Sequence, residues 1–235
     1  MSLQLSNVNK VMNDKTIVSD LSLTVPKGKI FGFLGPNGAG KTTTLHMAAG
    51  LMKPTSGEIL INGISIHEDW KKAKSQVSII ADYPLLYDEL SGMEYIQFSM
   101  ELFELKMTDS QLAAEIERFR FSSEISKRIK HYSLGNRKKL ALLVALLKQP
   151  KILLLDEYIS GLDPHNSILA REIFMDYAAK GGAILLSTHQ LEIAEKFCDE
   201  VILIKEGRLL DKSSLSEVLE QSNSLEQYYV SQIKT

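Results

Sequence analysis

A glycine-rich run is the feature that most limits what this chain can fold into. It follows the apolar segment Ile30 to Leu34 and reads Gly35-Pro36-Asn37-Gly38-Ala39-Gly40-Lys41-Thr42. The run fits G-x-x-x-x-G-K-S/T, in which glycines let backbone N–H groups surround phosphate oxygens without Cβ collisions. A helix beginning near Lys41 would direct its positive end at the same phosphates. The run therefore predicts a nucleotide-binding loop, with Lys41 on the β- and γ-phosphates and Thr42 on Mg²⁺.

Two acidic residues follow another apolar segment much later in the chain. Ile152 to Leu155 is followed directly by Asp156 and Glu157. An enzyme that hydrolyses a nucleotide needs a carboxylate at such a strand end to hold Mg²⁺ or its water, which suits Asp156. It also needs a group that orients or deprotonates the attacking water, and Glu157 suits that role. Together with the phosphate-binding loop, this pair predicts hydrolysis as well as binding.

Short apolar runs predict the strands of an α/β fold. In the first third of the chain, Leu21, Leu23 and Val25 alternate with polar residues, as in a strand with one buried face. Other runs are apolar throughout, which is typical of parallel sheets buried on both faces. The expected strands also include Glu58 to Ile61, Ile152 to Leu155, Ala183 to Leu186 and Val201 to Ile204.

The middle of the chain has a different pattern. From about residue 83 to residue 148 the pattern predicts mostly helices, with Thr108 and Gln111 spaced as a capping box and Leu140 to Leu147 apolar nearly all round, as in a buried helix. After about residue 211 the chain is polar, and we expect a surface helix or tail over residues 211–235. We expect one domain over residues 1–235.

A solvated basic face is expected from Lys127, Arg128, Lys130, Arg137, Lys138 and Lys139.

Composition narrows the classes of partner and compartment. The formal net charge is −2, which gives no long-range attraction to nucleic acid or to an anionic membrane. Cys198 is the only cysteine, so an internal disulfide is impossible and we expect a buried, unreactive thiol. The longest apolar run is far shorter than the roughly 18 residues that cross a bilayer, and the N-terminal segment lacks the apolar core of a secretory signal. We expect a cytoplasmic chain that only a partner would hold at a membrane.

Four groups of residues together resemble the ATP-binding subunits of ABC transporters. They are Gly35 to Thr43, Asp156-Glu157, Ser160-Gly161-Leu162-Asp163 and Ser187-Thr188-His189. The resemblance runs from Leu3 to about Gly207. It implies a P-loop NTPase core with a mostly parallel sheet, an N-terminal antiparallel β subdomain and an inserted α-helical subdomain. It also implies that ATP and Mg²⁺ are the ligands, and that hydrolysis drives transport.

The resemblance assigns roles to individual residues. Ser133 and Gly135 would form the signature motif, which grips the γ-phosphate of ATP held by a second subunit, and Ser133 would cap the helix through Leu147. His189 would contact the γ-phosphate and the catalytic base, and Asp163 would couple the two sites of a dimer. The implied catalytic residues are Lys41, Glu157 and His189. The implied metal ligands are Thr42, Asp82 and Asp156. The implied nucleotide-binding residues are Met12, Gly35, Pro36, Asn37, Gly38, Ala39, Gly40, Lys41, Thr42, Thr43, Ser133, Gly135 and Asp163.

Several positions depart from the commonest family pattern. Asp82 stands where a glutamine usually senses Mg²⁺, and a carboxylate can still bind that ion. Met12 replaces an aromatic residue that stacks on adenine, and a thioether can still pack on the ring. Leu134 and Asn136 replace a glycine and the final polar residue of the signature, and Tyr158 replaces a proline. The pattern is most similar to compact subunits of bacterial exporters for drugs, antimicrobial peptides or lipids.

The resemblance implies transmembrane permease subunits as partners, with either a homodimer or a paired second ATPase subunit, on the inner face of the cell membrane. A soluble ABC-type ATPase acting in translation or DNA repair is an alternative, but such proteins carry a second cassette or a long coiled-coil insertion. A GTPase would need an N-K-x-D run, and Asn9-Lys10-Val11-Met12 lacks the aspartate. A kinase would not need Ser160 to Asp163 or His189. A non-hydrolysing module would not need Lys41, Glu157 and His189 together.

Overall fold

Two sheets form the centre of the molecule. The computed structural model describes residues 2–233. The larger sheet has the strand order β10-β9-β3-β8-β7-β6, with every neighbouring pair parallel except β9 and β10. Its strands are β3 (Ile30–Leu34), β6 (Val77–Ile80), β7 (Ile152–Asp156), β8 (Ala183–Thr188), β9 (Glu200–Lys205) and β10 (Arg208–Ser214). This order places the segments that precede Gly35, Glu157 and His189 on three adjacent strands.

The smaller sheet is antiparallel and comes from the N-terminal part of the chain. It has the order β2-β1-β4-β5, and its strands are β1 (Leu3–Met12), β2 (Lys15–Val25), β4 (Ser56–Ile61) and β5 (Ile64–Ser65). Leu21, Leu23 and Val25 are buried, while the polar residues between them are less so, as the alternation in the sequence predicts. Pairing of β1 with both β2 and β4 puts it in the interior of this sheet.

The larger sheet is buried on both faces, which explains its continuous apolar strands. Phe31 and Phe33 point to a core shared with the antiparallel sheet and α1 (Lys41–Ala48). Ile30 and Leu34 point to a second core that includes the helices. Since successive strand residues face opposite sides, a strand covered on both sides must be apolar at every position.

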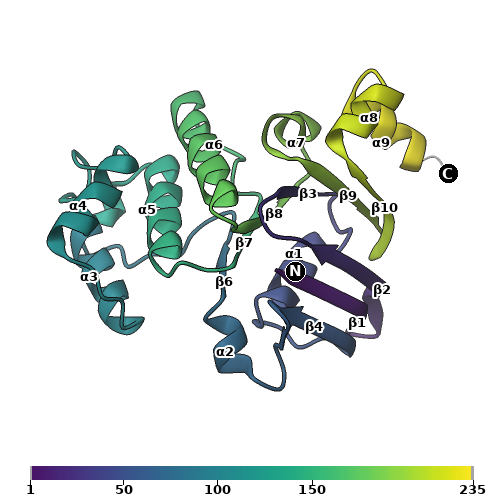
Figure 1. Cartoon of the computed structure of the whole chain (residues 1–235), viewed down its shortest axis with the longest axis horizontal. Helices are drawn as coiled ribbons and strands as arrows, with labels where there is room; N and C mark the ends of the chain where they lie inside the picture. The colour runs from purple at the N-terminus through teal and green to yellow at the C-terminus, as the bar shows by residue number, and fades with distance from the viewer. Residues whose placement is uncertain (1, 234–235) are drawn as a thin grey trace.

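Four helical segments lie between β6 and β7 in sequence and gather at one end of the molecule (Figure 1). They are α3 (Gly92–Leu102), α4 (Asp109–Arg118), the 3₁₀ turn η1 (Ile129–His131) and α5 (Leu134–Leu147). Both sides of the capping box of α4 are present: Thr108 accepts from the backbone of Gln111, and the Gln111 side chain accepts from the backbone of Thr108. The remaining helices are α2 (Trp70–Lys74), α6 (Pro164–Ala179), α7 (Leu191–Phe197), α8 (Leu215–Gln221) and α9 (Leu225–Ile233).

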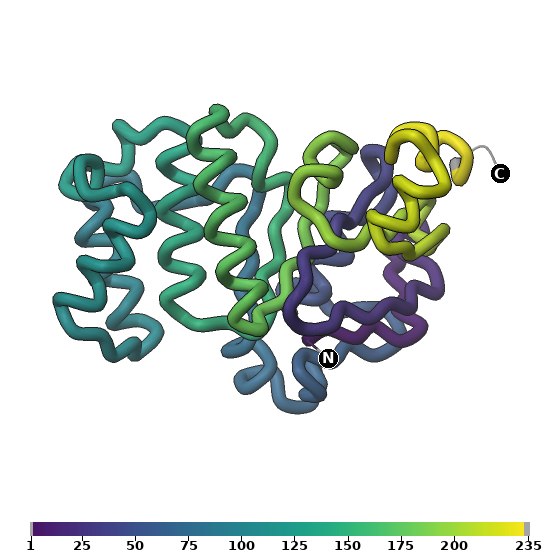
Figure 2. Tube along the Cα trace, turned by 45° about the horizontal axis from the view of Figure 1, so that its top comes forward, coloured from purple at the N-terminus to yellow at the C-terminus, as the bar shows by residue number. Residues whose placement is uncertain are grey.

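The predicted α/β architecture is confirmed: a mostly parallel sheet, an N-terminal antiparallel sheet and helices inserted between β6 and β7. The C-terminal region is more closely packed than the sequence suggests. Its two helices lie at the end of the molecule opposite to α3 and α4 (Figure 2). Val218 and Leu225 are buried, and the Tyr228 hydroxyl donates to Asp211 over 2.6 Å. A surface helix therefore describes this region only in part, because one side of each helix contributes to the core.

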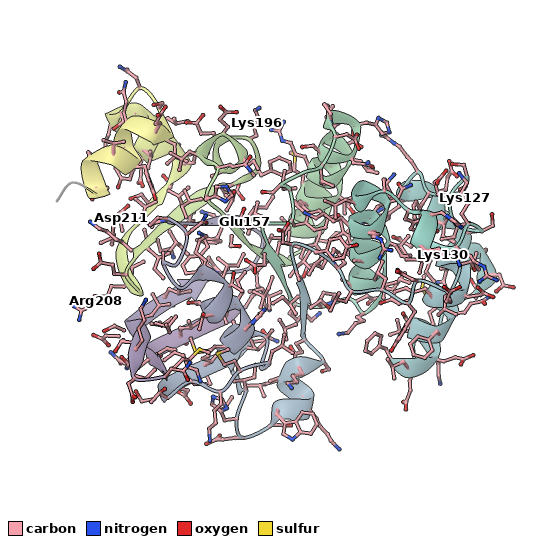
Figure 3. The ribbon with its side chains drawn as sticks, turned by 180° about the vertical axis from the view of Figure 1, so that it is seen from behind. Lys127, Lys130, Glu157, Lys196, Arg208 and Asp211 are labelled. Atoms are coloured by element: carbon pink, nitrogen blue, oxygen red, sulfur yellow. The ribbon has the colours of Figure 1, made fainter. Side chains whose placement is uncertain are left out.

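The prediction of a solvated basic face is wrong for half of its residues. Lys127, Arg128 and Lys130 are exposed, and Figure 3 shows Lys127 and Lys130 at the outer edge of the helical region. Arg137, Lys138 and Lys139 are instead buried in the first turns of α5. The error has a physical cause: α5 is buried on nearly all sides, so its charged residues have to find partners inside the protein.

Candidate active site

The phosphate-binding loop joins β3 to α1, as the sequence predicts. Its lysine, Lys41, is buried and donates to the backbone carbonyls of Gly35, over 2.7 Å, and Pro36, over 3.1 Å. Burial lowers the pKa of Lys41 below its usual 10.5, and the charges of Glu157 and Asp156 oppose that shift. Those charges act on Lys41 because the ends of β3 and β7 lie at the same edge of the sheet. The loop and the acidic pair therefore form one site.

Two glycines of the loop are required by close backbone approach. A Cβ at Gly35 would collide with the carbonyl oxygen of Ile204 on β9. Gly40 has a φ of +98°, and a Cβ there would lie 2.9 Å from the carbonyl oxygen of Ile17. These positions let the loop curl tightly at the start of α1, with its backbone open to a phosphate. The Thr42 side chain lies at the start of the same helix and is exposed, so its hydroxyl is accessible to a cation.

Ser187, at the end of β8, holds the acidic pair in place. Its hydroxyl donates to Asp156 Oδ1 over 2.5 Å and accepts from the Glu157 N–H over 3.1 Å. Asp156 is buried, and its position opposite Ser187 follows from the parallel pairing of β7 and β8. The sequence marks Ser187 only as part of the run before His189. Its hydrogen bonds depend on strand register, which a single sequence does not give.

The Glu157 carboxylate lies between two polar neighbours. Glu157 Oε1 is 2.9 Å from Nδ1 of His189, and Oε2 accepts from the Ser160 hydroxyl over 3.1 Å. Gln190 in turn donates to Ser160 over 3.1 Å. Figure 3 shows Glu157 near the middle of the molecule, between the N-terminal sheet and the helices. Such a carboxylate is held in one direction and can accept a proton from a water molecule that reaches it.

The structure brings Gly135 and Asp163 together. Asp163 caps α6 by accepting from the N–H of Asn166 over 3.0 Å, and a Cβ at Gly135 would lie 3.4 Å from Asp163 Oδ2. Ser133 caps α5, as expected, by accepting from the N–H of Asn136 over 3.3 Å. Met12, at the end of β1, is exposed. The exposed Ser133 and Met12 are therefore accessible to groups outside this chain.

Asp82 and Tyr158 have contacts that the sequence did not reveal. Asp82 Oδ1 accepts from the ammonium of Lys138 over 3.0 Å. Tyr158 is buried, and its hydroxyl donates to the backbone carbonyl of Lys138 over 3.1 Å. Both residues depart from the family pattern, and both contact the same lysine. The sequence does not predict these contacts of Lys138, because it does not tell which side of a helix is buried.

The residues present fit a magnesium–nucleotide complex. No cluster of three or more His, Cys, Asp or Glu side chains able to hold a metal is found among residues 2–233. In nucleotide sites Mg²⁺ keeps several waters and is held by one or two carboxylates together with substrate phosphates. Thr42 and Asp156 would be its ligands here. Gly35 and Gly40 avoid the collisions that side chains there would make with the backbone of Ile204 and Ile17, so the loop backbone can curl around a phosphate.

Comparison with known proteins agrees with the geometry. Residues 18–160 match the ABC transporter family. The chain is 38% identical over 223 residues to the uncharacterized ABC transporter ATP-binding protein YhcH of Bacillus subtilis, covering 92% of this chain and 70% of that one. It is 33% identical over 222 residues to Nod factor export ATP-binding protein I of Cupriavidus metallidurans, covering 93% and 73%. A solved ATP-binding subunit of an ABC transporter superposes with a TM-score of 0.91, at 30% identity, over 99% of this chain and 100% of that one.

The fold and the site thus define a P-loop nucleotide-binding protein with an inserted helical region. This chain belongs to the family of ABC transporter ATP-binding proteins. None of the helices in the described part of the chain has both the length and the apolar character that a membrane span needs.

Proposed function

We propose that this chain hydrolyses ATP, with Glu157 as the catalytic base. The observation that carries the proposal is the Glu157 carboxylate, which is held by the Ser160 hydroxyl and lies beside His189 at the edge of the sheet where the phosphate-binding loop begins. Parallel pairing of Leu34 with Thr188 and of Asp156 with Ser187 puts the three strand ends in line. A water molecule between the loop and Glu157 would be polarised by the carboxylate and could attack a phosphate.

Each remaining residue of the site has a role in this proposal. Bound ATP and Mg²⁺ supply the phosphoryl group that is transferred and the cation that neutralises its charge. Lys41 would leave its loop carbonyls to bind the β- and γ-phosphates, while Thr42 and Asp156 would hold Mg²⁺ directly or through water. Asp82, whose Oδ1 accepts from Lys138, would reach the same ion through its other carboxylate oxygen, and His189 would orient the γ-phosphate. Met12 would pack on the adenine, and Gly35 to Thr43 would surround the phosphates.

We propose further that two such subunits close around two ATP molecules. Support comes from the N-terminus of α5, where Ser133 is exposed and satisfies one N–H of the first turn, while other N–H groups of that turn lack helical partners. An ATP held by a second subunit would complete this terminus, since backbone N–H groups at a helix start bind phosphate. Gly135 lets Asp163 and Asn166 approach, and Asp163 would then contact the second subunit.

A transmembrane permease is the proposed partner. A groove of about 930 Å³ runs along the helical region, and large apolar side chains on its wall are exposed. They include Leu51, Tyr83, Leu85, Tyr87, Phe98 and Leu102. Lys71, Lys74 and Lys148 also line the groove, so an apolar segment flanked by acidic residues fits it. The chain would then sit on the inner face of the membrane, and the relative named for Nod factor export supports an exporter.

The test of the proposed hydrolysis compares Glu157→Gln with the wild type. The amide keeps the size of the side chain but cannot accept a proton, so steady-state ATP turnover should fall by roughly a thousandfold while ATP stays bound. Phosphate release and ATP binding by filter retention give the two quantities. Lys180→Met, which removes an exposed ammonium paired with Asp176, is the matched control and should keep wild-type turnover. Unchanged turnover in Glu157→Gln would remove Glu157 from the mechanism.

A further inference from the structure

Lys138 is a fully buried lysine outside the motifs that define the site. It lies in the second turn of α5, and its side chain has 0% exposure. Its ammonium lies 2.8 Å from the carbonyl oxygen of Ser160, 3.0 Å from Asp82 Oδ1 and 3.3 Å from the carbonyl oxygen of Glu157. One side chain thus joins α5, the second residue after β6 and the loop after β7.

The contacts of Lys138 use all of its hydrogen-bonding capacity. An ammonium has three N–H donors and no acceptor, and three oxygens surround this one. Asp82 supplies a full negative charge, so the buried cation is compensated. Burying an ammonium costs desolvation free energy, and a leucine or methionine could fill the same space without that cost. The contacts of Lys138 therefore indicate a role other than packing.

The contact with Glu157 falls on a strained part of the backbone. Glu157 has a φ of +47°, in the left-handed region that residues with a Cβ rarely adopt. Its carbonyl oxygen accepts from the Ser160 N–H over 3.1 Å as well as from Lys138. Such a conformation persists only where its surroundings hold it, and it sets the direction in which the side chain leaves the backbone. The ammonium of Lys138 is one of these restraints.

We propose that Lys138 is a positioning residue, which holds the backbone of the Glu157–Ser160 turn so that the Glu157 carboxylate faces the phosphate-binding loop. This inference rests on the proposed role of Glu157 as base. Asp82 is the counter-charge of Lys138, and in sequence it lies between Ala81 and Tyr83, which both line the groove. Tyr158 fixes α5 at the same place, because its hydroxyl donates to the Lys138 carbonyl and the ammonium lies 5.9 Å from its ring.

Five proteins in one assay test the role of Lys138: the wild type, Lys138→Met, Lys138→Arg, Lys180→Met and Glu157→Gln. Lys138→Met keeps the length and apolar stem of the side chain and removes the ammonium. We expect kcat for ATP hydrolysis to fall at least roughly tenfold, or about 1.4 kcal/mol, with the KM and Kd for ATP within about threefold of the wild type. Lys138→Arg, which keeps the charge and the donors, should recover part of kcat.

The outcomes separate the two proposals. If Lys138→Met retains a kcat within about twofold of the wild type, Lys138 does not position the base. A parallel loss of kcat and of ATP affinity also overturns the inference, because it reports damage to the whole site. If Lys138→Met does not fold, Lys138→Gln, which keeps a donor without the charge, takes its place under the same criteria. Equal turnover in the wild type and Glu157→Gln would instead contradict the proposed function on which this inference rests.

Discussion

At the candidate site, hydrogen bonds from one residue set the surroundings of its neighbours. Asp156 and Glu157 are adjacent in sequence, but Ser187 binds the carboxylate of the first and the N–H of the second. The register between β7 and β8 therefore gives the two carboxylates different surroundings. Asp156 is buried at the strand end, and Glu157 lies in the turn beyond it. A metal ligand and a proton acceptor need that difference.

Tyr158 stabilises the structure through its hydroxyl group. Tyr158 is 2% exposed, and replacement by phenylalanine leaves the carbonyl of Lys138 without this donor. We expect Tyr158→Phe to lower the free energy of unfolding by about 1 kcal/mol, the usual net value of one hydrogen bond. Urea denaturation followed by circular dichroism measures it. Tyr87→Phe, at an exposed tyrosine, is the control, and equal stability of both variants would show that the hydroxyl of Tyr158 contributes nothing.

For helices and strands, the sequence predicts where each element lies in the chain better than which residues it contacts. The strands are predictable because burial on both faces demands apolar residues throughout, and the start of α4 because Thr108 and Gln111 carry the capping box within four residues. The phosphate-binding loop is predictable because only glycine fits at Gly35 and Gly40. The contacts of Lys138 are not, since they join α5 to Asp82 and to Ser160, and such distances depend on how distant segments pack.

The cap of helix α6 should make stability depend on pH. The backbone N–H of Asn166 donates to Asp163, and so does its side-chain amide. These bonds, the backbone one more strongly, lower the pKa of the Asp163 carboxyl below its usual 3.8. Because the pKa is lower in the folded state, the carboxylate stabilises the protein above the unfolded value, and this contribution is lost as the pH falls through the folded pKa.

Asp163→Asn tests this expectation, because asparagine also caps helices but carries no charge. The stability advantage of the wild type over Asp163→Asn should be constant near neutral pH and should shrink below about pH 4. Urea titrations of both proteins at a series of pH values give the difference. An advantage that stays the same down to the acid limit of folding would show that the Asp163 charge does not contribute.

For the whole molecule, the helical region has two surfaces with different proposed partners. The groove along α3 is proposed for a permease, and the start of α5 for the ATP of a second subunit. Leu85, which is 90% exposed, lies on the groove wall. Leu85→Glu should abolish copurification with membrane proteins, because it puts a charge where an apolar segment would bind, and ATP binding should be unchanged.

Copurification from native membranes in mild detergent measures the effect of Leu85→Glu. An exposed leucine outside the groove, Leu219→Glu, is the control and should leave association intact. If both variants copurify with the same membrane proteins as the wild type, the groove is not the docking surface. If the wild type itself associates with no membrane protein, the proposal of a permease partner fails.

We propose that the phosphate-binding loop is half of a site that a second subunit completes. The most direct measurement is the mass of Glu157→Gln in solution by light scattering, with Mg²⁺ and with or without ATP. We predict a monomer without ATP, and with ATP a dimer that retains one ATP per subunit. A protein that binds ATP and remains a monomer at ATP concentrations well above the Kd for ATP would contradict the proposed shared site.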